Sequence, residues 1–170
     1  PILRTDIKLT SVAYSFMMGE FDTVIKETRD ELSQADCPQK YKNFFESYLI
    51  RSTVLTDPDL SREELETRLN ELTITDPTLA EKTRKVCLAL YDLTVAHQSN
   101  DYFEDLTNDF KYQQLEIIYY QALNATLKGD KDRAKELFNK LLSEDTSLYI
   151  VRMAKQYLED EVGDGLAIEE

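Results

Sequence analysis

Apolar residues recur along this chain with the spacing of amphipathic helices. Between residues 115 and 148 they fall at Leu115, Ile118, Ala122, Ala125, Ala134, Leu137, Phe138, Leu141 and Leu142. These steps of three and four residues match the 3.6-residue helical period. Midway, Lys128-Gly129-Asp130 supplies a glycine that can take the left-handed conformation after one helix and an aspartate that can cap the next. The segment therefore predicts a helical hairpin in which each helix has one apolar face.

The same period recurs through most of the sequence. We expect nine helices, at about residues 7–18, 21–33, 39–55, 61–72, 77–96, 102–110, 113–127, 131–142 and 146–161. Ser61 and Glu64 have the spacing of a capping box at the start of the fourth. Asp76 followed by Pro77 is typical of an N-cap and first helical residue, and opens the fifth.

Glycine and proline are scarce, with 4 of each in 170 residues, and no segment resembles an interdomain linker. We therefore expect one all-α folded unit over residues 1–161. Residues 162–170 contain two glycines and several acidic residues without a helical period. They predict a flexible acidic tail.

The expected helix pairs begin near Ile7, Gln39, Pro77 and Gln113, at steps of about 32 to 38 residues. A period of this size is typical of stacked helical hairpins. The clearest pair has small residues at Ala122 and Ala134, a turn at Gly129-Asp130, and a large residue at Phe138. On these positions it resembles a tetratricopeptide repeat (TPR). Residues 9–32 match more weakly, through Gly19, Phe21 and Val24, and the two middle pairs match only in period.

The resemblance implies a TPR-like α-solenoid: a right-handed superhelical array of about four helix-turn-helix hairpins plus a C-terminal helix. Such arrays bind a partner peptide or helix on the concave surface formed by their first helices. Members of the family that clamp an acidic chaperone tail use a lysine and an asparagine on that surface. The matching positions here hold Leu9 and Ala13 in one hairpin and Tyr119 and Leu123 in another, which excludes that ligand.

Two groups of residues are candidates for partner binding. Tyr119 and Leu123 are four residues apart, and we expect them to face a groove while Ile118 and Ala122 face the neighbouring helix. The last helix carries a stripe at Leu148, Val151, Ala154 and Leu158, and beside it a second stripe at Ile150, Met153 and Tyr157. Either this helix packs at a steep angle and buries both stripes, or the second is an exposed edge for a partner. The candidate residues are Tyr119, Leu123, Tyr149, Ile150, Met153 and Tyr157.

Charge narrows the classes of partner. A net charge of −13 argues against nucleic acid and against anionic membrane surfaces, because both require clustered lysine and arginine. It favours a partner protein with a basic segment. The sequence contains no apolar run long enough to span a membrane and no secretory leader, so we expect a cytoplasmic protein. Cys37 and Cys87 are expected to be free thiols in a reducing compartment.

The sequence offers no catalytic constellation. His97 is the one histidine and has no nucleophile at a recognisable spacing, and the two cysteines lie too far apart to suggest a zinc site. No phosphate-binding loop or calcium loop is present, so we expect neither an enzyme nor a cofactor or metal. Asn124-Ala125-Thr126 matches a glycosylation sequon in the middle of an expected helix, and we interpret it as a chance match.

These observations favour a protein–protein interaction scaffold or adaptor that acts as a subunit of a larger complex. Two alternatives stay open. The chain can be the ligand-sensing or dimerisation domain of a larger regulator with a DNA-binding part upstream. It can also belong to a vesicle coat or membrane-traffic complex, because residues 14–21 resemble the opening helix and turn of some coat subunits built from such repeats. Homo-oligomerisation is compatible with each of these functions.

Overall fold

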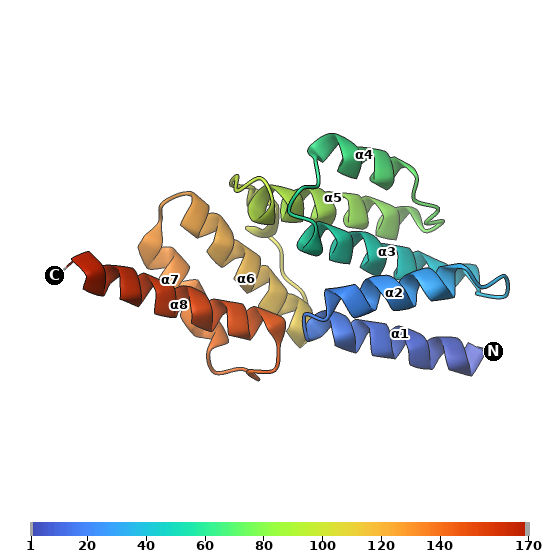
Figure 1. Ribbon diagram of the computed structural model, residues 1–170, viewed down its shortest axis with the longest axis horizontal. Helices are drawn as coiled ribbons and strands as arrows, with labels where there is room; N and C mark the ends of the chain where they lie inside the picture. The colour runs from blue at the N-terminus through green and yellow to red at the C-terminus, as the bar shows by residue number, and fades with distance from the viewer. Residues whose placement is uncertain (1, 169–170) are drawn as a thin grey trace. The chain divides into compact units, whose positions relative to one another are not determined.

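The computed structural model describes residues 2–168, with side chains described for residues 2–161. This part of the chain is all-helical and contains no strand, which confirms the predicted class (Figure 1). Its elements are α1 (Ile2–Met17), α2 (Phe21–Leu32), α3 (Gln39–Thr56), α4 (Arg62–Asn70), α5 (Pro77–Thr94), the 3-10 helix η1 (Asp101–Phe103), α6 (Lys111–Leu127), α7 (Lys131–Leu141) and α8 (Tyr149–Ile168).

The chain divides into two compact units, Pro1–His97 (unit 1) and Gln98–Glu170 (unit 2), where the sequence analysis expected one unit over residues 1–161. The last helix continues to Ile168, past its expected end at residue 161. Of the expected tail, residues 169–170 lie outside the described residues. Each unit is described by itself below.

Helix starts follow the predicted capping chemistry. The Ser61 hydroxyl accepts the Glu64 N–H, and the Glu64 carboxylate accepts the Ser61 N–H, which completes the capping box. The Asp76 carboxylate accepts the N–H groups of Thr78 and Leu79 at the start of α5. These side chains satisfy donors that the first turn of a helix leaves without an intrahelical partner.

Unit 1 is built around α3, which contacts α1, α2, α4 and α5 (Figure 1). Its core is made of fully or nearly fully buried apolar side chains, which include Val12, Val24, Phe45, Val54, Leu65, Cys87 and Leu90. Helices α1 and α3 pack with a fixed register. The Tyr41 hydroxyl donates to the Asp6 carboxylate, and the Arg51 guanidinium lies over the Phe16 ring, 4.9 Å from its centroid. Both pairs are 35 residues apart in sequence, within the predicted period.

The α1–α2 and α6–α7 hairpins share one turn geometry. Gly19 and Gly129 both have φ of 78°, in the left-handed region that glycine adopts without strain. The N–H of the residue after each glycine donates to a carbonyl five residues back, from Glu20 to Ser15 and from Asp130 to Ala125. This is the Schellman pattern that ends a helix. The turn predicted at Gly129 is confirmed.

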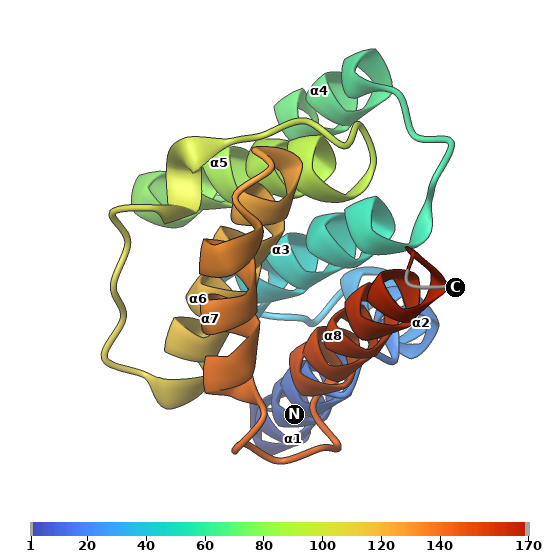
Figure 2. The same ribbon diagram turned by 90° about the vertical axis from the view of Figure 1, so that its left-hand side faces the viewer.

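Unit 2 consists of α6, α7 and α8 together with the segment that precedes α6. Helix α7 contacts both α6 and α8, and α6 also contacts α8 (Figure 2). Phe138 of α7 is fully buried, with its ring 6.1 Å from Tyr119 of α6 and 4.4 Å from Tyr157 of α8, centroid to centroid. Phe138 therefore fills the space between helices, as expected for the large residue of this hairpin.

The helix predicted at residues 102–110 does not form beyond the single 3-10 turn of η1. The Asn100 side chain accepts the Tyr102 N–H, and the Gln121 amide donates to the carbonyls of Phe103 and Glu104. Because side chains satisfy these backbone groups, the segment does not need helical hydrogen bonds. Its apolar residues are Phe103, Leu106 and Phe110. Phe103 is buried and its ring stacks on Tyr120, whereas Phe110 is 73% exposed. The expected third hairpin is therefore one helix followed by an irregular segment.

Candidate protein-binding surface

The predicted binding residues of unit 2 are mostly part of its core. Tyr119 is 5% exposed and packs edge-on against Tyr120 and Phe138. The prediction that Tyr119 faces a groove was therefore wrong, because its ring fills space between α6 and α7. Burial also raises the pKa of the Tyr119 hydroxyl. Ile150 is 1% exposed and is likewise a core residue.

The other four candidates are half-buried. They are Leu123, Tyr149, Met153 and Tyr157. Tyr157 packs against Phe138, and burial raises the pKa of Tyr149. Because Ile150 and Tyr157 both pack inward, α8 buries much of its second stripe, as one of the two interpretations of this helix expected. These residues do not form an exposed apolar patch.

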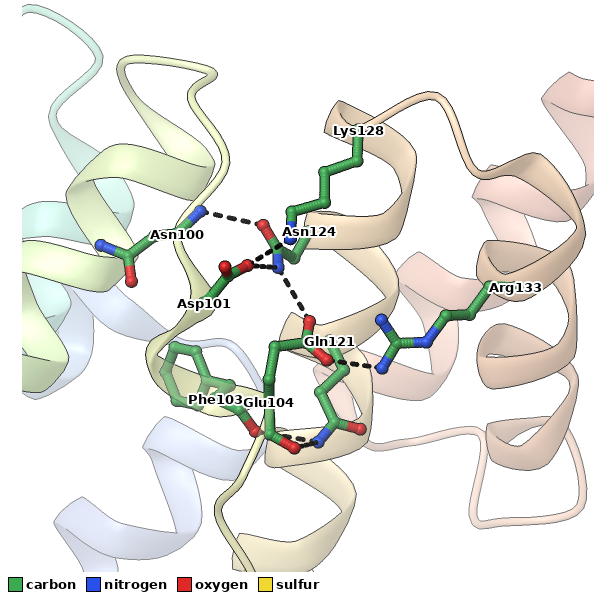
Figure 3. Close-up of polar contacts among 8 residues, drawn as sticks. All are labelled: Asn100, Asp101, Phe103, Glu104, Gln121, Asn124, Lys128 and Arg133. Atoms are coloured by element: carbon green, nitrogen blue, oxygen red, sulfur yellow. Dashed lines mark hydrogen bonds and ion pairs between the residues drawn. The ribbon is translucent and has the colours of Figure 1, made fainter.

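A network of polar side chains connects the segment before α6 to α6 itself (Figure 3). At its centre is Asn124, which is 1% exposed. The Asn124 carbonyl oxygen accepts the Asn100 N–H at 2.9 Å. Its Nδ2 donates to the carboxylates of Asp101 at 2.9 Å and Glu104 at 2.8 Å. With its amide buried and bonded, Asn124 is closed to glycosylation in the folded unit.

Two ion pairs complete the Asn124 network. Lys128 pairs with Asp101, and the hydrogen bonds from Lys128 and Asn124 lower the pKa of Asp101. Arg133 of α7 pairs with Glu104. Burial by itself would raise the pKa of Glu104, but hydrogen bonds from Arg133 and Asn124 hold it below its ordinary value. Both carboxylates are therefore engaged by the protein's own donors, and the network is structural rather than a ligand site.

The reactive side chains do not gather into a site. Cys37 and Cys87 are free and buried, as expected, and burial raises the pKa of the Cys87 thiol to about 12. His97 is exposed at the end of unit 1. Among the described residues, no three His, Cys, Asp or Glu side chains lie where they could hold a metal ion. None of the helices in residues 2–168 has the length and hydropathy needed to cross a membrane.

A row of exposed apolar residues lies on α1, where the sequence analysis did not place a site. Leu3, Ile7 and Tyr14 are 72%, 63% and 60% exposed. Together with Thr10 and Met17 they follow the four-then-three spacing of a coiled-coil seam, and we name these five residues the outer stripe. The opposite face of α1 is buried through Val12 and Phe16.

The charged residues of α1 border the outer stripe and bind other helices. Arg4 makes two hydrogen bonds to the Glu31 carboxylate of α2, at 2.8 and 3.2 Å. Lys8 lies 3.8 Å from Glu27, and Asp6 accepts from Tyr41 of α3. The stripe itself carries no charge. Helix α1 therefore has an apolar core face and a second apolar face that unit 1 leaves exposed.

The sequence contained a sign of this surface. The expected first helix began at residue 7, so Leu3 lay outside it. The helix begins at Ile2, and this extra turn adds Leu3 and completes the seam. Comparison of the chain with protein-family models, curated proteins and solved structures gave no match in any of the three.

Proposed function

We propose that this chain is a protein-binding module, and that the outer stripe of α1 pairs with an apolar helix of a partner protein. The observation that carries the proposal is the exposure of Leu3, Ile7 and Tyr14 on one uncharged face. Exposed apolar patches on folded domains commonly mark interaction sites. The partner is another protein in a larger complex, consistent with a scaffold or adaptor.

The spacing of the stripe selects a helix as the occupant. Residues that alternate at four and three positions stay on one side of a helix and receive the side chains of a second helix laid alongside. From Leu3 to Met17 the stripe is roughly 21 Å long, at 1.5 Å per residue. Burial of each large apolar side chain is worth about 1.5–3 kcal/mol, before the cost of association. Three such side chains supply about 4.5–9 kcal/mol toward that cost.

Affinity capture from the native extract tests this function. The bait is the wild-type chain, beside an Ile7→Gln/Tyr14→Gln variant whose fold is checked by circular dichroism. Glutamine keeps good helix propensity, so the variant removes apolar surface without breaking α1. Phe110→Gln is the matched control, because Phe110 is 73% exposed in unit 2 and lies outside the stripe.

We expect one or more proteins to be retained by the wild type and the control but lost by the stripe variant. Retention of the same proteins by all three baits would contradict the assignment of the surface. Capture of no specific protein by the wild type would contradict the function itself.

A further inference from the structure

The segment between η1 and α6 exposes apolar and acidic side chains next to one another. Phe110 is 73% exposed, and Leu106 is half-buried. Asp105 and Asp109, which precede these two residues in the chain, are both exposed. We name residues 105–110 the acidic loop. The sequence analysis expected a helix here, and the irregular segment that forms instead leaves most of its apolar side chains outside the core of unit 2.

The two aspartates of the acidic loop are not neutralised by the rest of the chain. Among the described side chains, neither Asp105 nor Asp109 takes part in a hydrogen bond or an ion pair. The next base along the chain is Lys111, whose Nζ lies 2.9 Å from a carboxylate oxygen of Glu144. The basic residues of the Asn124 network pair with the two carboxylates of that network. The loop therefore combines exposed apolar surface with negative charge that is free to bind a cation.

The backbone of the acidic loop is held in place. The Asn108 N–H donates to the side-chain oxygen of Gln114 at 2.8 Å, and the Phe110 N–H donates to the side-chain oxygen of Asn108 at 2.9 Å. The Leu106 N–H donates to the Phe103 carbonyl at 3.3 Å. A surface that is already ordered costs less conformational entropy to bind than a loose chain. The exposure of Phe110 is therefore a fixed feature of unit 2.

We propose that the acidic loop binds an apolar segment of a partner protein that carries arginine. A guanidinium of the segment stacks on the Phe110 ring and pairs with Asp109. Asp105 binds a second basic group, and a neighbouring apolar side chain packs against Leu106. Arginine fits this surface because its planar group stacks on aromatic rings and presents N–H groups that match a carboxylate.

This site goes beyond the outer stripe, because it lies in unit 2 and selects its partner by charge. It also gives a position on the chain for the basic partner that the net charge of −13 favours. Titration of the isotope-labelled full chain with synthetic hexapeptides, followed through backbone amide NMR shifts, tests it. The first peptide has two leucines flanked on each side by two arginines. In the second, lysines replace the arginines, and in the third, glutamines replace them.

We expect the first peptide to shift the amides of residues 105–110 in a saturable way, the lysine peptide to bind more weakly, and the glutamine peptide to cause no such shifts. Phe110→Gln and Asp105→Asn/Asp109→Asn should each weaken the first peptide about fivefold. Glu159→Gln/Asp160→Asn removes the same charge from exposed acids of α8 and should change the affinity less than twofold, because salt screens distant charges.

The Ile7→Gln/Tyr14→Gln variant separates this site from the outer stripe, since it should bind the first peptide as wild type does. A loss of peptide binding in that variant would place the peptide on α1 and overturn the site. Equal weakening by the two acid variants would reduce the effect to long-range charge and also overturn it. Equal binding of the arginine and lysine peptides, or shifts that are no larger at residues 105–110 than elsewhere, would do the same.

Discussion

Asn124 connects residues that are distant in sequence through one buried amide. Its three hydrogen bonds reach the backbone of Asn100 and the carboxylates of Asp101 and Glu104. The sequence alone could not assign this role, because a polar residue in a helix usually faces solvent. Tyr119 was misplaced for a related reason. Helix α6 is buried on several sides, through Leu115, Ile117, Tyr119, Tyr120, Ala122, Asn124 and Ala125, so a single apolar stripe does not describe it.

Asn124→Ala should lower the free energy of unfolding by about 2–3 kcal/mol, because it leaves buried hydrogen-bonding groups without partners. Urea denaturation followed by circular dichroism measures the change. Asn139→Ala is the control, since Asn139 is exposed on α7. Equal stability of the two variants would show that the Asn124 network does not support the fold.

The network should also make stability depend on pH. The pKa of Glu104 is lower in the folded chain than its ordinary value of 4.5, so its ionised form stabilises the fold. That contribution is complete above the ordinary pKa and is lost as the pH falls through the folded pKa. The difference in unfolding free energy between wild type and Glu104→Gln should therefore be largest near neutral pH and shrink below about pH 4.5. A difference independent of pH would contradict the role of this carboxylate.

At the scale of elements, the helices that the sequence predicted well carry their own start and stop residues. Ser61, Asp76, Gly19 and Gly129 act within a few residues of their position, so local sequence was sufficient. The helix expected at 102–110 failed because Gln121, from α6, binds the carbonyls of Phe103 and Glu104. A competition of that kind depends on the fold and is not visible in a local pattern.

Gly129→Ala tests the turn of the α6–α7 hairpin. A Cβ at this position meets no atom within 4 Å, so the cost comes from the backbone, whose φ is +78°. We expect a loss of about 1–2 kcal/mol in unfolding free energy. Gly129→Asn should lose less, because asparagine tolerates this conformation. Thermal and urea unfolding measure both, and an alanine variant as stable as wild type would contradict the assigned strain.

At the scale of the whole molecule, the helical class followed from composition and period, whereas the binding surface did not. The sequence placed the candidates on the last helices, but Tyr119 and Ile150 are buried there, whereas the exposed apolar residues of the outer stripe lie on α1. Whether a helix face is exposed to a partner depends on which faces the other helices of the fold cover. The right-handed superhelix and the resemblance to tetratricopeptide repeats stay predictions. The helix contacts within each unit are consistent with a helical repeat array.

The net charge of −13 leads to a prediction about partner association. If the partner of the outer stripe also carries the basic segment that this charge favours, its association rate should fall as salt rises, because screening weakens long-range attraction. Stopped-flow or surface-binding kinetics at two salt concentrations measure this rate. An association rate unchanged by salt would remove the basic segment from the proposal and leave the apolar pairing in place.

The central claim is that the outer stripe of α1 binds a partner helix. The most direct test is titration of the purified captured partner against wild type, Ile7→Gln/Tyr14→Gln and Phe110→Gln. Loss of two apolar side chains that are buried in the complex should raise the dissociation constant by about a hundredfold. The dissociation constant of the Phe110→Gln control should stay within about twofold of that of wild type. Equal affinities for all three chains would contradict the claim.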